Sequence, residues 1–466
     1  MQLNHQPMLP DDVSDKPLCG ADNQVRGKLG AAVLSLLGAM HGLALAQATD
    51  NATSVDGAVM HYKESGGRVS TTEAVVHAKE TLNDGETLGL KLTFDTLSGG
   101  SPNGALPSKQ VQTFARPSGK SLSTSAVVTP VQTYTTASGR VASSGGGSST
   151  SGPYTVAPGA LPLDTSFRDQ RIAASLDWSL PIDSLTNLAV GGSFSHETDF
   201  LSLSTSATLS RDFNNKNTTL SAGVNLETDS IKPIGGAPVP LSTYSDFLKE
   251  GNKRKQVGDV LLGVSQVINR RWIMQLNWST DKSSGYQNDP YKVVSALNAD
   301  GSVKDYIYEN RPDKRTRNSL YWGNKFALDH DTIDFSLRHM SDDWGIKSDT
   351  AEVRYRFAVS DSIYLEPQAR YYKQSAADFF HFYLLDGAPY VPYASADPRL
   401  AKFHAQTFGL KFGMQLDKDS EISLRLQSYK QSGKGPDVSQ LPQLQGLNLY
   451  PGLKAQLIEA GLKVSF

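Results

Sequence analysis

The feature that most constrains the fold is a repeated alternation of apolar and polar residues with a period of two. Leu88, Leu90 and Leu92, for example, are separated by Gly89 and Lys91. A period of two places one set of side chains on each face of a β-strand. We count sixteen such stretches, which predict an all-β protein: 57–65, 69–82, 87–96, 167–180, 187–196, 200–213, 217–228, 256–268, 272–281, 316–328, 331–341, 350–359, 363–375, 404–416, 420–431 and 453–466.

The connections between these stretches indicate which kind of β protein to expect. Short connections are found at 83–86, 181–186, 214–217, 269–271, 329–330, 360–362 and 417–420, and long ones at 97–166, 229–255, 282–315, 376–403 and 432–452. Short turns on one side and long loops on the other are typical of outer-membrane barrels, whereas a soluble sandwich has mostly short loops. Strands of roughly 9–11 residues suffice to cross the membrane, and closure satisfies every backbone amide. The sequence therefore predicts an antiparallel transmembrane β-barrel of about sixteen strands in the outer membrane of a Gram-negative bacterium.

The N-terminal region, residues 1–48, is expected to be an extension followed by a signal peptide. The apolar segment 29–46 follows Arg26 and Lys28 and ends in small residues that fit a cleavage site. The only cysteine, Cys19, precedes this segment outside a lipobox, so the mature chain, 49–466, is expected to contain no cysteine. About eight residues separate the cleavage site from the first strand, and we therefore expect no plug domain there.

Composition excludes several classes of function. The chain has 466 residues with 45 basic and 47 acidic side chains, a formal charge of −2. A general nucleic-acid binder needs a basic surplus, so this class is excluded. Beyond the N-terminus no run of eighteen apolar residues could form a membrane-spanning helix. The loop 97–166 contains a tract, 135–152, in which fourteen of eighteen residues are Ser, Thr or Gly, which predicts a long flexible extracellular loop.

The C-terminus supports the barrel independently. Glu459, Gly461, Val464 and Phe466 follow a polar, glycine, apolar and aromatic spacing that ends at the last residue. This pattern resembles the signal that the barrel-assembly machinery reads on the final strand. We therefore expect that machinery to be a partner during biogenesis, and outer-membrane lipid and lipopolysaccharide to be partners of the finished barrel.

Several motifs together resemble a family of uncharacterised proteobacterial outer-membrane proteins, known as a domain of unknown function. They are Phe167-Arg168-Asp169-Gln170-Arg171, the run from Asp95 through Ser98-Gly99-Gly100-Ser101-Pro102-Asn103-Gly104 to Ala105, Tyr372 to Phe379, and Ser395-Ala396-Asp397-Pro398-Arg399-Leu400. The resemblance covers essentially the whole mature chain. It implies an outer-membrane barrel and no established activity.

The inward-facing charges are the candidate functional residues. Between 316 and 431 they comprise seven basic and three acidic side chains: Lys325, Arg338, Arg354, Arg356, Arg370, Lys411 and Arg425 against Asp334, Glu352 and Glu366. Charges inside a barrel need water or partners. Two interpretations stay open: a cationic channel wall that favours anions, or an ion-paired, loop-filled interior that stabilises the barrel. A barrel of sixteen strands is wide enough for an aqueous lumen, which favours the first interpretation slightly.

Two loop motifs receive structural interpretations. The glycine-rich run 98–104 is expected to turn the long loop back, although its amides could also form an anion-binding nest. Asp378, Asp397 and Arg399 are expected to pin their loop by an ion pair rather than to bind a cation, because calcium requires more oxygen ligands.

An enzymatic alternative rests on His339 and Ser341. A His-x-Ser pair on the lipid face resembles the active site of outer-membrane phospholipase, in which the histidine activates the serine. Here Asp342-Asp343-Trp344 follows and no asparagine obviously orients the histidine, so an interfacial histidine is the preferred interpretation. No cofactor or metal site is expected. The favoured function is a passive pore for small, possibly anionic, solutes; the alternatives are a structural barrel that holds a periplasmic or surface partner and, remotely, a lipid hydrolase.

Overall fold

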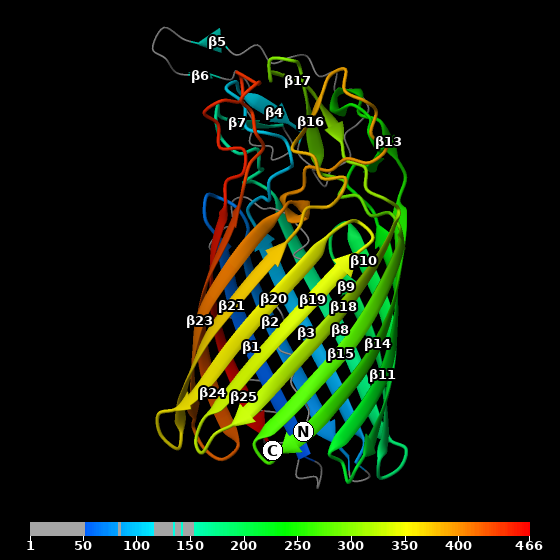
Figure 1. Ribbon diagram of the computed structural model, residues 1–466, viewed down its shortest axis with the longest axis vertical. Helices are drawn as coiled ribbons and strands as arrows, with labels where there is room; N and C mark the ends of the chain where they lie inside the picture. Colours follow the sequence, from blue (N-terminus) through cyan, green and yellow to red (C-terminus); the bar gives the residue numbers. More distant parts are fainter. Residues whose placement is uncertain (1–51, 83–84, 116–133, 136–140, 143–152) are drawn as a thin grey trace.

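The computed structural model describes residues 52–82, 85–115, 134–135, 141–142 and 153–466 (Figure 1). Sixteen antiparallel strands form one closed barrel. In the order around the barrel they are β1 (Ala52–Glu64), β2 (Ser70–Thr81), β3 (Thr87–Ser98), β8 (Arg168–Pro181), β9 (Thr186–His196), β10 (Phe200–Phe213), β11 (Thr218–Ile231), β14 (Lys253–Asn269), β15 (Trp272–Gly285), β18 (Lys314–Ala327), β19 (Thr332–Asp342), β20 (Lys347–Ala358), β21 (Ile363–Gln374), β23 (Phe403–Gln415), β24 (Ser420–Gly433) and β25 (Leu453–Ser465). The predicted number and order of strands are confirmed.

Closure is made by the first and last strands. β1 pairs with β25 over a continuous antiparallel register from Ser54 opposite Ser465 to Glu64 opposite Ala455. Both ends of the barrel sheet therefore lie at the same rim, beside the short turns (Figure 1). A closed sheet has no unpaired edge, which is the condition for crossing lipid with strands. The predicted extension and signal peptide, residues 1–48, lie outside the described residues and remain a prediction.

The two faces of the sheet differ as the alternation predicts. On β3, Leu88, Leu90 and Leu92 point outward with 37%, 43% and 47% of their surface exposed, whereas Lys91 and Asp95 point into the barrel. Large exposed apolar side chains recur along the outer face of the other strands. Such a band would be unfavourable in water but matches the hydrocarbon of a membrane. No helix in the described part of the chain is both long and apolar enough to span a membrane.

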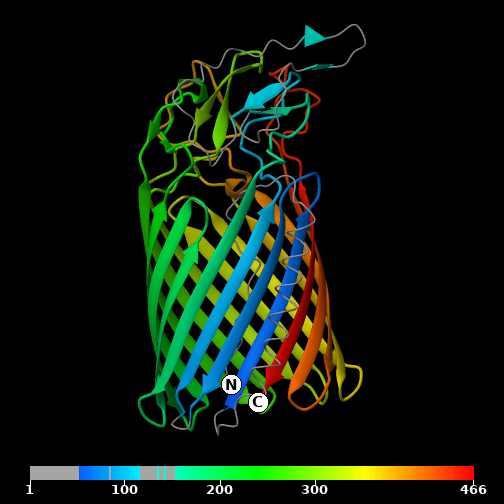
Figure 2. The same ribbon diagram turned by 180° about the vertical axis from the view of Figure 1, so that it is seen from behind.

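The long loops fold together at the extracellular end, as Figure 2 shows. The strands leave five long loops there: 99–167, 232–252, 286–313, 375–402 and 434–452. Within them lie β4 (Gln112–Phe114), β5 (Tyr134–Thr135), β6 (Val141–Ala142), β7 (Tyr154–Val156), β12 (Ala237–Pro238), β13 (Lys249–Glu250), β16 (Val293–Leu297), β17 (Val303–Tyr308), β22 (Tyr383–Leu385) and the short 3-10 helices η1 (Tyr244–Asp246) and η2 (Pro398–Leu400). We call the described parts of these loops the cap.

The cap has hydrophobic cores of its own. One cluster joins Phe114 and Tyr154 from the first long loop to Val293 and Tyr308 from the third. A second cluster brings three loops together through Leu106, Leu297, Leu441, Leu444 and Leu449. Because apolar burial stabilises a packed arrangement, the cap is a small folded layer rather than a set of independent loops. The tract 135–152, predicted to be flexible, lies almost wholly outside the described residues.

Candidate functional site: the barrel lumen and its cap

The register places the predicted candidate residues of the lumen on the inward face. On β20, Val353 and Phe357 face outward, so Glu352, Arg354 and Arg356 face the interior. The same alternation turns the other candidates inward on their strands: Lys325, Arg338, Asp334, Glu366, Arg370, Lys411 and Arg425. The orientation follows from the sequence pattern, whereas their roles stay predictions.

Among the residues that the structure describes, carboxylates form ion pairs with Arg354, Lys325 and Arg425. Arg354 Nη2 lies 2.5 Å from Glu352 Oε1 on the same strand. The ammonium of Lys325 lies 3.5 Å from Asp334, and Arg425 Nε lies 3.9 Å from Glu459. These pairs reduce the positive field that the cations exert on the lumen.

Three other cations form no ion pair among the described residues: Arg356, Arg370 and Lys411. They lie on the neighbouring strands β20, β21 and β23. Glu366 stands opposite Lys411 in the register without forming an ion pair with it. Arg338 stacks on Tyr321, its guanidinium carbon 5.6 Å from the ring centre. This side of the lumen therefore retains an excess of positive charge.

An aromatic platform supports the unpaired cations near the periplasmic end. The guanidinium of Arg356 lies 3.5 Å from the centre of the Tyr364 ring, and the Lys411 ammonium lies 5.8 Å from it. The Tyr364 hydroxyl donates to Glu421 at 2.6 Å. On β23, Gly413 leaves the space that this ring fills, since a Cβ there would overlap the ring. A cation over an aromatic face is held in place without losing its charge.

Other interior ion pairs were not predicted from the sequence. Arg171 on β8 binds Asp95 on β3 at 2.5 Å and Glu73 on β2 at 3.2 Å. Arg317 on β18 binds Asp281 on β15 at 2.7 Å. Asp95 and Asp281 occupy inward positions on the strands adjacent to their arginine partners, whereas Glu73 lies one strand further away, on β2.

The inner wall is unequal around the barrel. On β9, β10 and β11 many inward positions are small, including Gly191, Ser193, Ser204, Ser206 and Gly223, although Glu227 and Asp229 on β11 also face inward. The hydroxyls of Ser193 and Ser204 share a hydrogen bond of 2.7 Å. On β20, β21 and β23 the inward positions instead include Arg354, Arg356, Arg370, Lys411 and Tyr364, so the two sides of the inner wall differ in side-chain size and charge.

The cap is tied by a buried ion network between two loops. Arg311 donates to Asp397 at 2.8 Å and to Glu309 at 3.0 Å, and Arg399 Nη2 reaches Asp397 at 2.5 Å and Asp289 at 3.2 Å. Glu309 and Asp397 are only 2% and 1% exposed. The predicted pinning of this loop by Asp397 and Arg399 matches the geometry, whereas Asp378 forms no ion pair in the described part of the chain.

The network shifts the ionisation of its two buried acids in opposite directions. Desolvation raises the pKa of the Glu309 carboxyl above its ordinary value, although Arg311 acts in the other direction. For Asp397 desolvation also acts upward, but Arg399, Lys292 and Arg311 outweigh it and hold the pKa below its ordinary range. Asp397 therefore remains a carboxylate throughout the physiological range.

The glycine-rich run 98–104 serves as a turn. Gly99 and Gly104 have φ angles of +94° and +93°, which side chains with a Cβ rarely adopt. A Cβ on Gly99 would overlap the carbonyl of Arg68. Lys292 donates to Ser101 at 2.5 Å and to the Pro102 carbonyl at 2.8 Å, which attaches the turn to the cap.

His339 and Ser341 face outward at the extracellular end of β19. His339 Nδ1 lies 2.7 Å from Asp349 Oδ1, and Lys373 Nζ lies 3.2 Å from the other oxygen of Asp349. Asp349 thus supplies the orienting group that the sequence did not reveal. The side chain of Ser341 makes no hydrogen bond within the described ranges, so the serine and histidine are not joined as a nucleophile and base.

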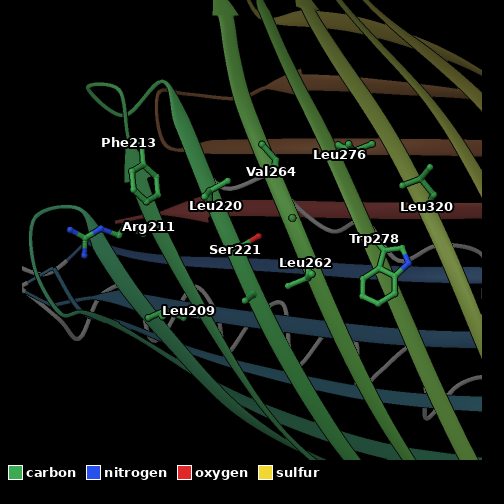
Figure 3. A pocket seen from close by; sticks show the side chains of 12 residues that line it. Leu209, Arg211, Phe213, Leu220, Ser221, Leu262, Val264, Leu276, Trp278 and Leu320 are labelled. Carbon is green, nitrogen blue, oxygen red and sulfur yellow. The ribbon is translucent and has the colours of Figure 1, made fainter.

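Two further features resemble ligand sites. Asp169, Glu197 and Asp199 have ligand atoms within 4.8 Å of one another. Thr198 donates to Asp169 at 2.6 Å and Tyr291 donates to Asp199 at 2.5 Å, so protein donors occupy part of this cluster. A groove of about 490 Å³ lies on the outer face, where its lining includes Leu220, Val264, Leu276 and Leu320 (Figure 3). This apolar lining faces lipid, not the lumen.

The last strand carries the predicted assembly signal. Glu459 points inward, and a Cβ on Gly461 would lie 2.9 Å from the Ser423 hydroxyl. Val464 lies opposite Val55 on β1, and the Phe466 amide donates to the Thr53 carbonyl at 2.8 Å. These residues form part of the closing seam.

The closed sheet, its apolar outer band and its polar interior define a β-barrel of the Gram-negative outer membrane. More particularly, the chain belongs to DUF3570, a protein family of unknown function, whose pattern matches residues 26–464. No curated protein matches it significantly.

The solved structures that match this chain do so at low identity and low TM-score. A mutant of the ferric enterobactin receptor PfeA from Pseudomonas aeruginosa has 9% identity and a TM-score of 0.39, with 82% of this chain and 54% of that one covered. The siderophore receptor PirA from Acinetobacter baumannii has 9% identity and a TM-score of 0.38, covering 83% and 53%. OpdK from Pseudomonas aeruginosa with vanillate has 9% identity and a TM-score of 0.36, covering 90% and 99%. The chain spans about half the length of the siderophore receptors it matches.

Proposed function

We propose that the barrel is a passive pore for small anionic solutes. The observation that carries the proposal is the set of inward cations without an ion-pair partner among the described residues: Arg356, Arg370 and Lys411. A narrow polar tube with low-dielectric walls focuses the field of such charges and raises the local concentration of counter-ions. The serine-rich wall of β9 and β10 offers hydroxyl groups that hydrate a passing solute, whereas Glu227 on β11 adds a carboxyl group to the same side of the lumen.

The paired cations limit the size of the effect. Because Arg354, Lys325 and Arg425 lie close to carboxylates, the preference for anions is expected to be modest. It should weaken as salt shortens the Debye length to about 8 Å near physiological ionic strength.

The test is the reversal potential across a salt gradient in a planar bilayer. The double variant Arg356→Gln with Lys411→Gln removes two unpaired charges from the lumen and should lower the anion-to-cation permeability ratio severalfold. The matched control, Lys282→Gln with Lys314→Gln, removes the same charge from the outer face and should leave the ratio unchanged. Cation preference in the unmodified protein, or an unchanged ratio in the lumen variant, would overturn the proposal.

A second candidate function is a structural barrel that presents a surface or periplasmic partner. The buried clusters and the ion network of the cap favour it, because they stabilise a folded layer at the extracellular mouth. Such a barrel would be silent in the bilayer experiment, whereas a pore gives discrete conductance steps. For biogenesis we further propose that the assembly machinery reads the closing strand, and that lipopolysaccharide surrounds the extracellular rim.

A further inference from the structure

A row of basic side chains follows the outer face of the barrel at the extracellular rim. Six neighbouring strands, β20, β21, β23, β24, β25 and β1, contribute one outward residue each. We call these residues the lysine belt: Lys347, Lys373, His404, Lys430, Lys454 and Lys63. All six are exposed. The belt is a local concentration of basic side chains in a chain whose formal charge is −2.

The register brings basic residues face to face. Lys430 on β24 stands directly opposite Lys454 on β25, and Lys373 on β21 stands opposite His404 on β23. The like charges of Lys430 and Lys454 in a direct cross-strand pair are destabilising. Among the outward residues in the extracellular half of these strands, the only acid is Asp349, which already binds Lys373 at 3.2 Å and His339. Within the described part of the chain, most of the belt is therefore without a counter-charge.

The position of the lysine belt relative to the apolar band determines which anionic groups can reach it. On β24 the exposed Leu424 and Leu426 precede Ser428 and then Lys430, in the direction of the extracellular end. On β23 the exposed Phe408 lies on the membrane side of His404. The charges thus stand directly above the apolar band, where the headgroups of the outer leaflet lie.

The rim is not basic all the way round. In their extracellular halves β2, β3, β10 and β11 carry no charged outward residue; Thr72, Thr96, Leu201 and Thr228 are examples. A shorter basic group on β14, β15 and β18 includes Lys282 and Lys314, but these two lysines stand opposite Thr316 and Ser284 rather than opposite another base. A general attraction to any lipid would not require this asymmetry.

We propose that the lysine belt binds the phosphate groups of a phosphorylated glycolipid of the outer leaflet, the lipid A portion of lipopolysaccharide. Phosphate accepts charge-assisted hydrogen bonds from lysine ammonium groups, and one phosphate between Lys430 and Lys454 would relieve the repulsion between them. The proposal names residues for the lipid partner expected above and does not depend on the barrel being a pore.

The experiment titrates the full chain, purified in a neutral detergent, with lipid A in the presence of a divalent-cation chelator. The double variant Lys430→Gln with Lys454→Gln should bind about thirty-fold more weakly, on the basis of two surface lysines at the usual contribution each. The matched control, Lys282→Gln with Lys314→Gln, removes the same charge from rim lysines that face no other base. It should bind as the unmodified protein does.

Four results would overturn the proposal. Equal binding of dephosphorylated lipid A would exclude phosphate as the recognised group. Displacement of lipid A by inorganic phosphate at an equal concentration would indicate a free-anion site instead. An equal loss of affinity in the belt variant and the control would indicate general attraction to the rim, and unchanged affinity in the belt variant would assign the belt to another role. Bilayer conductance of the same variant separates these outcomes from failure of the pore proposal, because the belt lies outside the lumen.

Discussion

Replacing Asp397 by asparagine should loosen the cap without unfolding the barrel. The carboxylate of Asp397 is 1% exposed and accepts from Arg311 at 2.8 Å and from Arg399 at 2.5 Å. Asparagine has nearly the same shape but leaves two guanidinium groups without their shared counter-charge. Removing one partner from a buried ion pair costs about 3–5 kcal/mol.

The structure places the expected cost at the lower end of that range. Glu309 still compensates Arg311, whose side chain is 10% exposed. The Arg399 side chain is 36% exposed, so water screens it once Asp397 is gone. A loss of about 3 kcal/mol raises the open population of the cap about 150-fold.

The assay is hydrogen exchange of the backbone amides in β16 and β22, which pair with each other inside the cap. Their exchange should accelerate by about two orders of magnitude, while amides of the barrel strands keep their rates. Asp386→Asn is the matched control on the same loop, because its ion pair with Lys304 at 2.8 Å is about half exposed and worth less than about 1 kcal/mol. Equal exchange in the two variants would refute the assignment of the buried network as the fastening of the cap.

Three further predictions follow from single residues. Gly413→Ala should displace Tyr364 and lower the free energy of unfolding by about 1–3 kcal/mol. The folded barrel, which migrates faster than the unfolded chain in unheated gel electrophoresis samples, should then be lost at a lower temperature. Gly435→Ala, where a Cβ has space, should leave that temperature unchanged. Desolvation lowers the pKa of Lys249, whose ammonium lies 4.3 Å from the centre of the Tyr308 ring, to about 8. At pH 8 its neutral amine should therefore react with an acylating reagent faster than Lys418, as mass spectrometry of the peptides would show; equal rates would contradict the shift. Phe466→Ala should reduce the yield of assembled barrel relative to Leu426→Ala, and equal yields would count against the assembly signal.

The barrel was predictable because its determinants are local. Each strand shows the period of two by itself, and the short turns fix the direction of its neighbours. The boundaries moved by a few residues, as at β14, which begins at Lys253 rather than at 256, because polar residues at the rim extend the ladder beyond the apolar band. Closure of the barrel adds one non-local pairing to these local determinants, that of β1 with β25.

The cap and the interior ion pairs were not predictable in the same way. Arg311 and Asp397 are 86 residues apart and lie in loops without periodicity, so no pattern in the sequence joins them. Asp95 and Arg171 are 76 residues apart, and a long loop separates their strands. Partner choice depends on which residues the register and the loop packing bring together, whereas the alternation fixes only the face on which each side chain lies.

Near-neutrality of the whole chain therefore says little about the fields that a solute or lipid meets. The closed sheet sorts charges by face: unpaired cations project into the lumen from β20, β21 and β23, and the lysine belt projects outward from these and adjoining strands. Acids that balance them in the total are partly confined to the cap, where Asp289, Glu309 and Asp397 bind arginines. A barrel can thus be nearly neutral overall and yet carry positive charge on both the inner and the outer face of the same strands. The reason is that successive residues of a strand point alternately into the lumen and out of the barrel.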